Sequence, residues 1–122
     1  RRLREEIGFN NFLLLDGTSS NPEINLYRRF VTASNIVGIF DQFKVPHEVD
    51  YMSVDIDSCD LWLFFAITEK YRPRVMTVEY NSNYALEDYS TLRCADPTAT
   101  GAYHWQGDNI YGASLSAIEL AA

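Results

Sequence analysis

The segment from Tyr51 to Asn81 restricts the possible folds most, because it contains a long apolar run between two short apolar runs. The first run, DYMSVDID, predicts a strand that is nearly continuous in apolar character. It passes directly into SCDLWLFFAITEKY, whose length and apolar surface predict a buried helix, with Asp57 or Ser58 as its N-cap. The run YRPRVMTVEYN predicts a second strand, with Pro73 at its entrance. A strand, a helix and a strand in this order form a βαβ unit, which predicts a parallel sheet.

Further elements are predicted before this unit. A strand is expected at Phe12–Leu15, where an Asp-Gly turn follows, and a more exposed strand is expected in NLYRRFVT. The stretch TASNIVGIFDQFKVP predicts a helix that Thr32 or Ser34 caps and that Pro46 ends. We therefore expect one α/β domain over residues 1–122, and the uncapped look of both ends predicts that the chain is a fragment.

Residues 82–107 are polar and aromatic, and they predict one long loop. Loops of this length in a compact domain are usually functional lids or disordered segments. In this loop Tyr103 and Trp105 either clamp a substrate or cover the sheet, and His104 is either a catalytic base or a surface histidine.

Charge and cysteine content bear on partners and location. The chain has 10 basic and 17 acidic residues, so its net charge of −7 disfavours nucleic acid and anionic lipid as partners. No apolar run is long enough for a membrane span. The two cysteines, Cys59 and Cys94, have no CxxC spacing, which argues against a zinc site and a disulfide-rich scaffold. We therefore expect Cys59 to be a packing residue and the compartment to be reducing, which predicts a cytoplasmic protein.

Acidic residues mark the ends of the two predicted strands of the βαβ unit. Side chains alternate along a strand, so Asp55 and Asp57 share one face, and Glu79 and Asn81 share one face of the next strand. If the strands are parallel neighbours, the four side chains converge at the carboxyl edge, where open α/β sheets bind ligands. Asp55 lies inside an apolar strand, so we expect it to be buried and to need a partner, a metal or a ligand donor.

Three of the acids also have plain structural interpretations. Asp57 and Asp60 lie where the predicted helix begins, and carboxylates there cap backbone N–H groups and complement the helix dipole. Asp16 precedes Gly17 at a strand end, where an aspartate is often only a turn residue. The alternative for Asp16 is to accept hydrogen bonds from a ribose diol of a bound nucleotide.

The chain resembles FkbM-type methyltransferases, a branch of the class I fold that uses S-adenosylmethionine (SAM). The stretches DYMSVDIDSCDLWLFFAI and YRPRVMTVEYN are similar to the family segment D-(apolar)-K-I-D-V-E-G-x-E … P-x-(apolar)-x-x-E. FLLLDGTSSNPEINL looks like the family's second strand, and YGASLSAIEL looks like a later helix. The resemblance implies a Rossmann-like, mostly parallel sheet with flanking helices, which is incomplete here because no glycine-rich loop precedes Phe12. A chain that lacks this loop is expected to bind SAM poorly by itself.

The resemblance implies roles for particular residues. Asp16 falls on the acid that binds the ribose of SAM, and Asp55 and Asp57 fall on the Asp and the first Glu of I-D-V-E-G. Asp60 falls on its second Glu, and Glu79 closes the fifth strand, so that Asp55, Asp57 and Glu79 line the cofactor and acceptor crevice. Departures occur at three positions where the family has glycine, a small residue and lysine, namely Ser58, Cys59 and Ser53. The activity implied is O-methyl transfer to a small-molecule or sugar hydroxyl.

Other functions stay open. Asp57 and Asn81 can supply oxygen ligands for Mg²⁺, as in the catechol-type methyltransferases that this site resembles, and Asp55 with Asp57 forms the D-x-D of metal-dependent glycosyltransferases. A third interpretation is an inactive Rossmann-like module that binds a partner through aromatic residues, namely Tyr103, Trp105 and Tyr111. Exposed sheet edges would favour a homo-oligomer.

Overall fold

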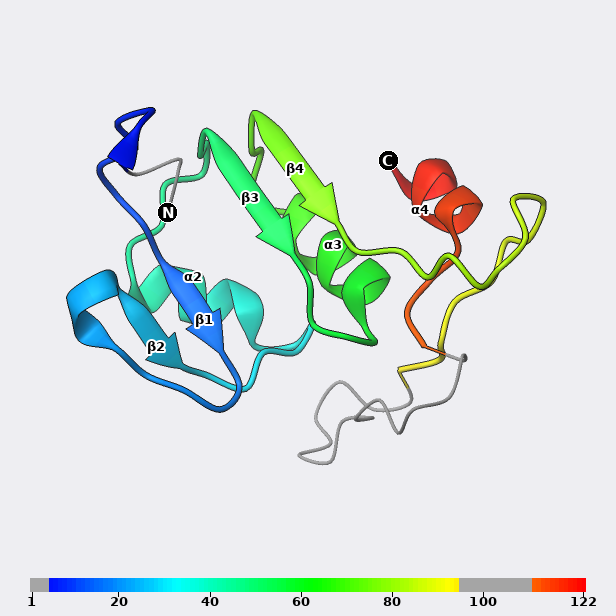
Figure 1. Ribbon diagram of the computed structural model, residues 1–122, viewed down its shortest axis with the longest axis horizontal. Coiled ribbons are helices and arrows are strands. Elements are labelled where there is room, and N and C mark those ends of the chain that lie inside the picture. Colours follow the sequence, from blue (N-terminus) through cyan, green and yellow to red (C-terminus); the bar gives the residue numbers. More distant parts are fainter. Residues whose placement is uncertain (1–4, 95–110) are drawn as a thin grey trace. The chain divides into compact units, whose positions relative to one another are not determined.

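The computed structural model of the chain describes residues 5–94 and 111–122 (Figure 1). The chain divides into two compact units, Arg1–Val31 and Thr32–Ala122, and each is described by itself. Both units contain a pair of short parallel strands, and the second also contains α-helices, which confirms the predicted α/β class. Among the described residues the strands form two separate two-stranded pairs, so the larger Rossmann-like sheet stays a prediction.

The first unit holds the strand pair β1 (Leu14–Asp16) and β2 (Leu26–Arg28), which run parallel. Their connection includes a short 3-10 helix, Pro22–Ile24. Asn25 follows it with a left-handed φ of 54°, which asparagine tolerates better than most residues. Its carbonyl accepts a hydrogen bond from the amide of Leu14 at 3.0 Å, so the connection is tied to the start of β1. Both strands overlap the segments predicted for them.

The second unit contains the predicted βαβ arrangement. Strand β3 (Tyr51–Val54) leads through α3 (Asp60–Thr68) into β4 (Val75–Val78). The two strands pair in parallel over all four residues of each. Their carboxyl ends therefore lie side by side, which is the condition under which the acids that follow them can meet.

Helix α2 (Ile36–Gln42) confirms the helix predicted from TASNIVGIFDQFKVP, although the predicted cap is wrong. The N-cap is Asn35, because the carbonyl of Thr32 accepts hydrogen bonds from the amides of Asn35 and Ile36 and makes a turn before the helix. Ser34 lies inside this turn. The helix ends before Lys44, whose left-handed φ of 54° directs the chain away from the helix axis.

Helices cover one face of the β3–β4 pair. Helix α3 contacts both strands and also α2 and α4, which explains why its surface is apolar on most sides. None of the helices in the described residues is long and apolar enough to span a bilayer. The core between α3, α4 and the strands contains Leu61, Phe64 and Ala113, with Met76, Val78, Ala117, Ile118 and Ala121 packed against them.

A second buried site lies where α2 meets the end of α3. Tyr71 is fully buried, with its ring at 5.1 Å from the ring of Phe40 in an edge-on contact and at 5.3 Å from the ring of His47 in a stacked one. Its hydroxyl donates to Asp41 Oδ1 at 3.2 Å, and Lys70 Nζ forms a salt bridge with the same oxygen at 2.7 Å. The residue thus combines a large apolar contact with one hydrogen bond.

Helix α4 (Leu115–Ala121) confirms the helix predicted in YGASLSAIEL. Its N-cap is Ser114, which is fully buried and whose hydroxyl accepts a hydrogen bond from the amide of Ala117. The same hydroxyl accepts from the amide of Ser90 at 3.1 Å and donates to the carbonyl of Asp88 at 2.6 Å. One side chain therefore connects the helix start to the segment that follows β4.

Candidate functional site

Asp55 follows β3 directly and is exposed, so its predicted burial is wrong. The reason is that, among the described residues of this unit, helices cover one face of the β3–β4 pair only. On the other face Tyr51, Ser53 and Thr77 are exposed, and their hydroxyls form a chain of hydrogen bonds of 2.9 and 3.1 Å. Asp55 continues this exposed face by strand alternation, which leaves the residue exposed.

Asp57 lies in the turn between β3 and α3, has a left-handed φ of 65° and is exposed. Glycine is usual at such a position, and aspartate is one of the few other residues that adopt it routinely. The family pattern places its glycine one residue later, at the buried Ser58. The conformation directs the chain out of β3 and into α3 while Asp57 stays at the sheet edge.

Asp60 is the fully buried acid of this region and the first residue of α3. Its Oδ1 accepts a hydrogen bond from the amide of Ile56 at 2.8 Å, whereas its buried Oδ2 has no hydrogen-bond partner among the described residues. Burial raises the pKa of this carboxyl, and the negative charge of Asp55 adds to the effect. The residue at the N-cap is Cys59, so the cap predicted at Asp57 or Ser58 is wrong.

Glu79 follows β4 directly, and its amide donates to the carbonyl of Val54 at 2.9 Å, which holds it beside the end of β3. Its Oε2 is buried without a hydrogen-bond partner among the described residues. Burial, followed by the negative charges of Asp55, Asp60 and Asp57, raises the pKa of Glu79 to about 7. Glu79 is therefore the carboxyl in this site that exchanges its proton near neutral pH.

Three of these acids form a compact group, which we call the acid cluster: Asp55, Asp57 and Glu79. One carboxylate oxygen from each lies within 4.8 Å of the others. Like charges this close disfavour full ionisation unless a cation compensates them. Carboxylate oxygens are also the ligands that Mg²⁺ and Ca²⁺ prefer, so the chemistry of the donor set fits a hard divalent cation.

Asn81 does not join the acid cluster. It is buried, and its Nδ2 donates to the carbonyl of Tyr111 at 3.0 Å. Its Oδ1 accepts two hydrogen bonds from Asn83, one from the backbone amide at 2.9 Å and one from Nδ2 at 2.8 Å. Asn81 thus joins the end of β4 to the segment before α4. The predicted pairing of Asp57 with Asn81 as metal ligands is replaced by a cluster of Asp57 with Asp55 and Glu79.

Asp16 lies at the end of β1, in the other compact unit. Its Oδ1 accepts hydrogen bonds from the amide of Thr18 at 2.6 Å, the hydroxyl of Thr18 at 2.8 Å and the amide of Ser19 at 2.7 Å. These bonds, the one from the Thr18 hydroxyl foremost, lower the pKa of Asp16. The structure therefore gives this residue the role in a turn that was one of its two interpretations.

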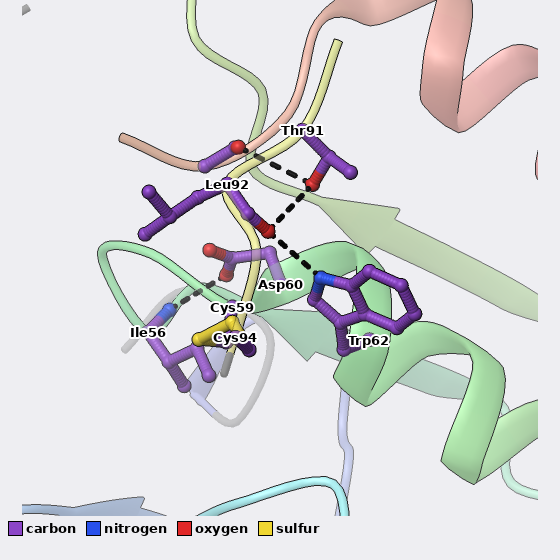
Figure 2. The surroundings of a disulfide bond; sticks show 8 residues. Ile56, Cys59, Asp60, Trp62, Thr91, Leu92 and Cys94 are labelled. Carbon is purple, nitrogen blue, oxygen red and sulfur yellow. Dashed lines mark hydrogen bonds between the residues drawn. A yellow bond between two sulfur atoms is a disulfide. The ribbon is translucent and has the colours of Figure 1, made fainter. Parts of the chain in front are cut away.

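A disulfide bond joins Cys59 to Cys94, and Figure 2 shows its surroundings. The prediction that Cys59 is a packing residue is wrong. Its spacing of 35 residues from Cys94 has no local motif, and the even number of cysteines was the one available signal. Disulfides persist mainly in oxidising compartments, so the cytoplasmic prediction loses the support that it drew from the cysteines.

The segment Thr91–Cys94, which we call the strap, lies against the start of α3 (Figure 2). Besides the disulfide, Trp62 Nε1 donates to the carbonyl of Leu92 at 2.9 Å. The amide of Leu92 donates to the carbonyl of Gly112 at 2.8 Å. The first part of the predicted long loop is therefore fixed on the helix that starts beside the acid cluster. Tyr103, His104 and Trp105 lie outside the described residues.

The raised pKa of Glu79 predicts a pH dependence of stability. Its folded value of about 7 exceeds the ordinary 4.5, so the folded chain holds a proton that the unfolded chain has released between these values. The free energy of unfolding should therefore fall as pH rises from about 4.5 to about 7, by on the order of 1 kcal/mol after screening by solvent. Urea unfolding at several pH values measures this, and Glu79→Gln should flatten the profile. An equal slope in Glu79→Gln would assign the dependence to other groups.

Comparison with known proteins identifies no relative. No protein-family model, no curated protein and no solved structure matches the chain. The functional interpretation therefore depends on the acid cluster and on the residues around it.

Proposed function

We propose that the chain is a SAM-dependent methyltransferase-like domain of FkbM-like type, which transfers a methyl group to a small-molecule or sugar hydroxyl. The observation that carries the proposal is the acid cluster, whose three carboxylates meet at the carboxyl ends of two parallel strands. Parallel α/β sheets bind their ligands at this edge. The resemblance of the segments around Asp55 and Glu79 to the family pattern supports methyl transfer in particular.

In this proposal the acid cluster holds a divalent cation, for which Mg²⁺ is the best match. Asp55 and Asp57 are exposed and reach the edge from one loop, and Glu79 reaches it from the next strand. A cation bound there would act as a Lewis acid on the oxygen of the acceptor hydroxyl. The cation would also compensate the repulsion between the three carboxylates, and this relief would favour cation binding.

Methyl transfer also requires that the acceptor hydroxyl lose its proton. SAM supplies a methyl group that leaves with no electrons from the broken sulfur–carbon bond, so the acceptor oxygen must provide the electron pair and lose its proton. Glu79 is one of the cation's ligands in this proposal, so its raised pKa of about 7 describes the cluster without the cation. The acceptor hydroxyl, whose pKa a bound cation would lower, would release its proton to solvent. Asp16 is left out of the proposed site, because its Oδ1 accepts three hydrogen bonds within its own turn and it belongs to the other compact unit.

A second candidate is a metal-dependent transferase that acts on a nucleotide sugar. It is favoured by one observation, namely that both aspartates of the D-x-D sequence Asp55–Asp57 belong to the acid cluster. In such enzymes the metal contacts the diphosphate of the donor, so the same three carboxylates would serve a different substrate. The two candidates share the cation and differ in the group that is transferred.

Two measurements test these functions. Calorimetric titration of the chain with Mg²⁺ should show binding at one site, and the absence of binding would contradict both candidates and favour a partner-binding module. Transfer of a labelled methyl group from SAM to catechol or sugar hydroxyls, which the expected poor binding of SAM would make slow, should then depend on Mg²⁺ and stop on chelation. Transfer of a sugar from a nucleotide donor, without methyl transfer, would establish the second candidate instead.

A further inference from the structure

The turn that carries two of the three cluster acids also carries one half of the disulfide. Asp55 and Asp57 lie in the connection from β3 to α3, and Cys59 is the N-cap of α3 at its far end. The Cα atoms of Cys59 and Cys94 are 6.0 Å apart, so the disulfide joins this turn to the strap. Any change in the disulfide therefore acts on the backbone that positions the acid cluster.

Hydrogen bonds also hold the turn, including backbone bonds from Ser58 to the Asp60 carboxyl and from Asp57 to the Glu79 carboxyl. The hydrogen bond from the Ile56 amide to Asp60 Oδ1 closes the turn, and Asp57 between them has its left-handed φ of 65°. The N-cap residue Cys59 makes no side-chain hydrogen bond to the helix, unlike Ser114 at the start of α4. The disulfide to Cys94 therefore attaches the start of α3, whereas the start of α4 has a capping hydrogen bond.

The strap has attachments of its own that do not involve sulfur. Leu92 is bonded to Trp62 and to Gly112, and Thr91 pairs with Ala113 in an antiparallel bridge. Cleavage of the disulfide would thus leave the strap attached at Thr91 and Leu92 and would release mainly the turn beside Cys59. Both cysteines are partly exposed.

We propose that the Cys59–Cys94 disulfide is a redox-sensitive tether of the acid cluster, which keeps Asp57 placed for cation binding when oxidised and releases it when reduced. The proposal rests on the cation site of the proposed function. In the reduction a dithiol gives up two electrons and two protons and becomes a disulfide, while the sulfur–sulfur bond of Cys59 and Cys94 breaks to give two thiols. The reduced turn loses its covalent attachment, and three like charges then favour conformations that separate them.

The test compares Mg²⁺ affinity of the oxidised chain, the chain reduced with dithiothreitol and the double variant Cys59→Ser/Cys94→Ser. We expect the reduced chain and the double variant to bind Mg²⁺ about tenfold more weakly or worse, as is typical when support around metal ligands is lost. Dithiothreitol should leave the affinity of the double variant unchanged, which controls for chelation. Counting free thiols verifies the oxidation state of each sample.

Amide hydrogen exchange supplies the second readout, because it distinguishes local release of the turn from loss of the fold. Faster exchange confined to residues 56–60 is expected on reduction, with β3 and β4 still protected. Equal Mg²⁺ affinity in both oxidation states would overturn the tether while leaving the cation site intact. Binding in neither state would overturn both the site and the tether, and faster exchange throughout β3 and β4 would show that the disulfide supports the whole unit instead.

Discussion

The substitution Asp57→Asn is expected to lower Mg²⁺ affinity by about tenfold to a hundredfold and to abolish methyl transfer, with no loss of folding. The change keeps the shape of the side chain and removes one of the three negative charges of the acid cluster. The same change should slightly raise the stability of the cation-free chain, because it relieves repulsion by Asp55 and Glu79. Calorimetry and urea unfolding of one preparation measure both effects, whose opposite signs separate a ligand role from a structural one.

Asp50→Asn is the matched control. Asp50 lies just before β3, at the opposite end of the strand from the cluster, and pairs with Arg74 at 2.8 Å on the exposed surface. The substitution Asp50→Asn removes one negative charge, as Asp57→Asn does. The exposed ion pair that it breaks contributes little to stability. If Asp50→Asn weakens Mg²⁺ binding as much as Asp57→Asn does, net charge rather than the cluster attracts the cation.

The substitution Tyr71→Ala is expected to lower the free energy of unfolding by about 4 kcal/mol, a large part of the stability of a domain of this size. Tyr71 is fully buried against Phe40 and His47, so truncation removes a whole aromatic ring and leaves a cavity. Tyr71→Phe keeps the ring and removes only the hydrogen bond to Asp41, which should cost about 1 kcal/mol.

Denaturant unfolding of both variants measures this difference. Equal losses in Tyr71→Phe and Tyr71→Ala would show that the hydrogen bond to Asp41, and with it the Lys70 pair, dominates over the ring. The strap and the acid cluster lie at the other end of α3, so their hydrogen exchange below the unfolding transition should be unchanged in Tyr71→Phe.

The βαβ arrangement could be predicted because local pattern determines it. Apolar runs of strand and helix length alternate between Tyr51 and Val78, and the crossover leaves few choices for the direction of the strands. The meeting of Asp55 with Glu79 follows from the same register, since both residues come directly after the paired strands. These features depend on residues that are close in sequence.

Burial at the site could not be predicted in the same way. Alternation along β3 does not reveal which face the helices cover, so Asp55 was expected inside and Asp60 was not, whereas the reverse holds. The disulfide brings together residues 35 positions apart, and no pattern near Cys59 or Cys94 marks the partner. The hydrogen bonds of Asn81 to Tyr111 and Asn83 likewise depend on where a distant segment returns.

The hydroxyl of Ser114 has a consequence for cooperativity. Helix α4 has seven residues, and a helix of that length is not stable alone in water. Its start is fixed by a side chain that also bonds Asp88 and Ser90, which lie 26 and 24 residues earlier. We therefore expect the helicity of α4 to report whether the segment around Ser90 is docked, and we expect local opening of that segment and melting of α4 to occur together.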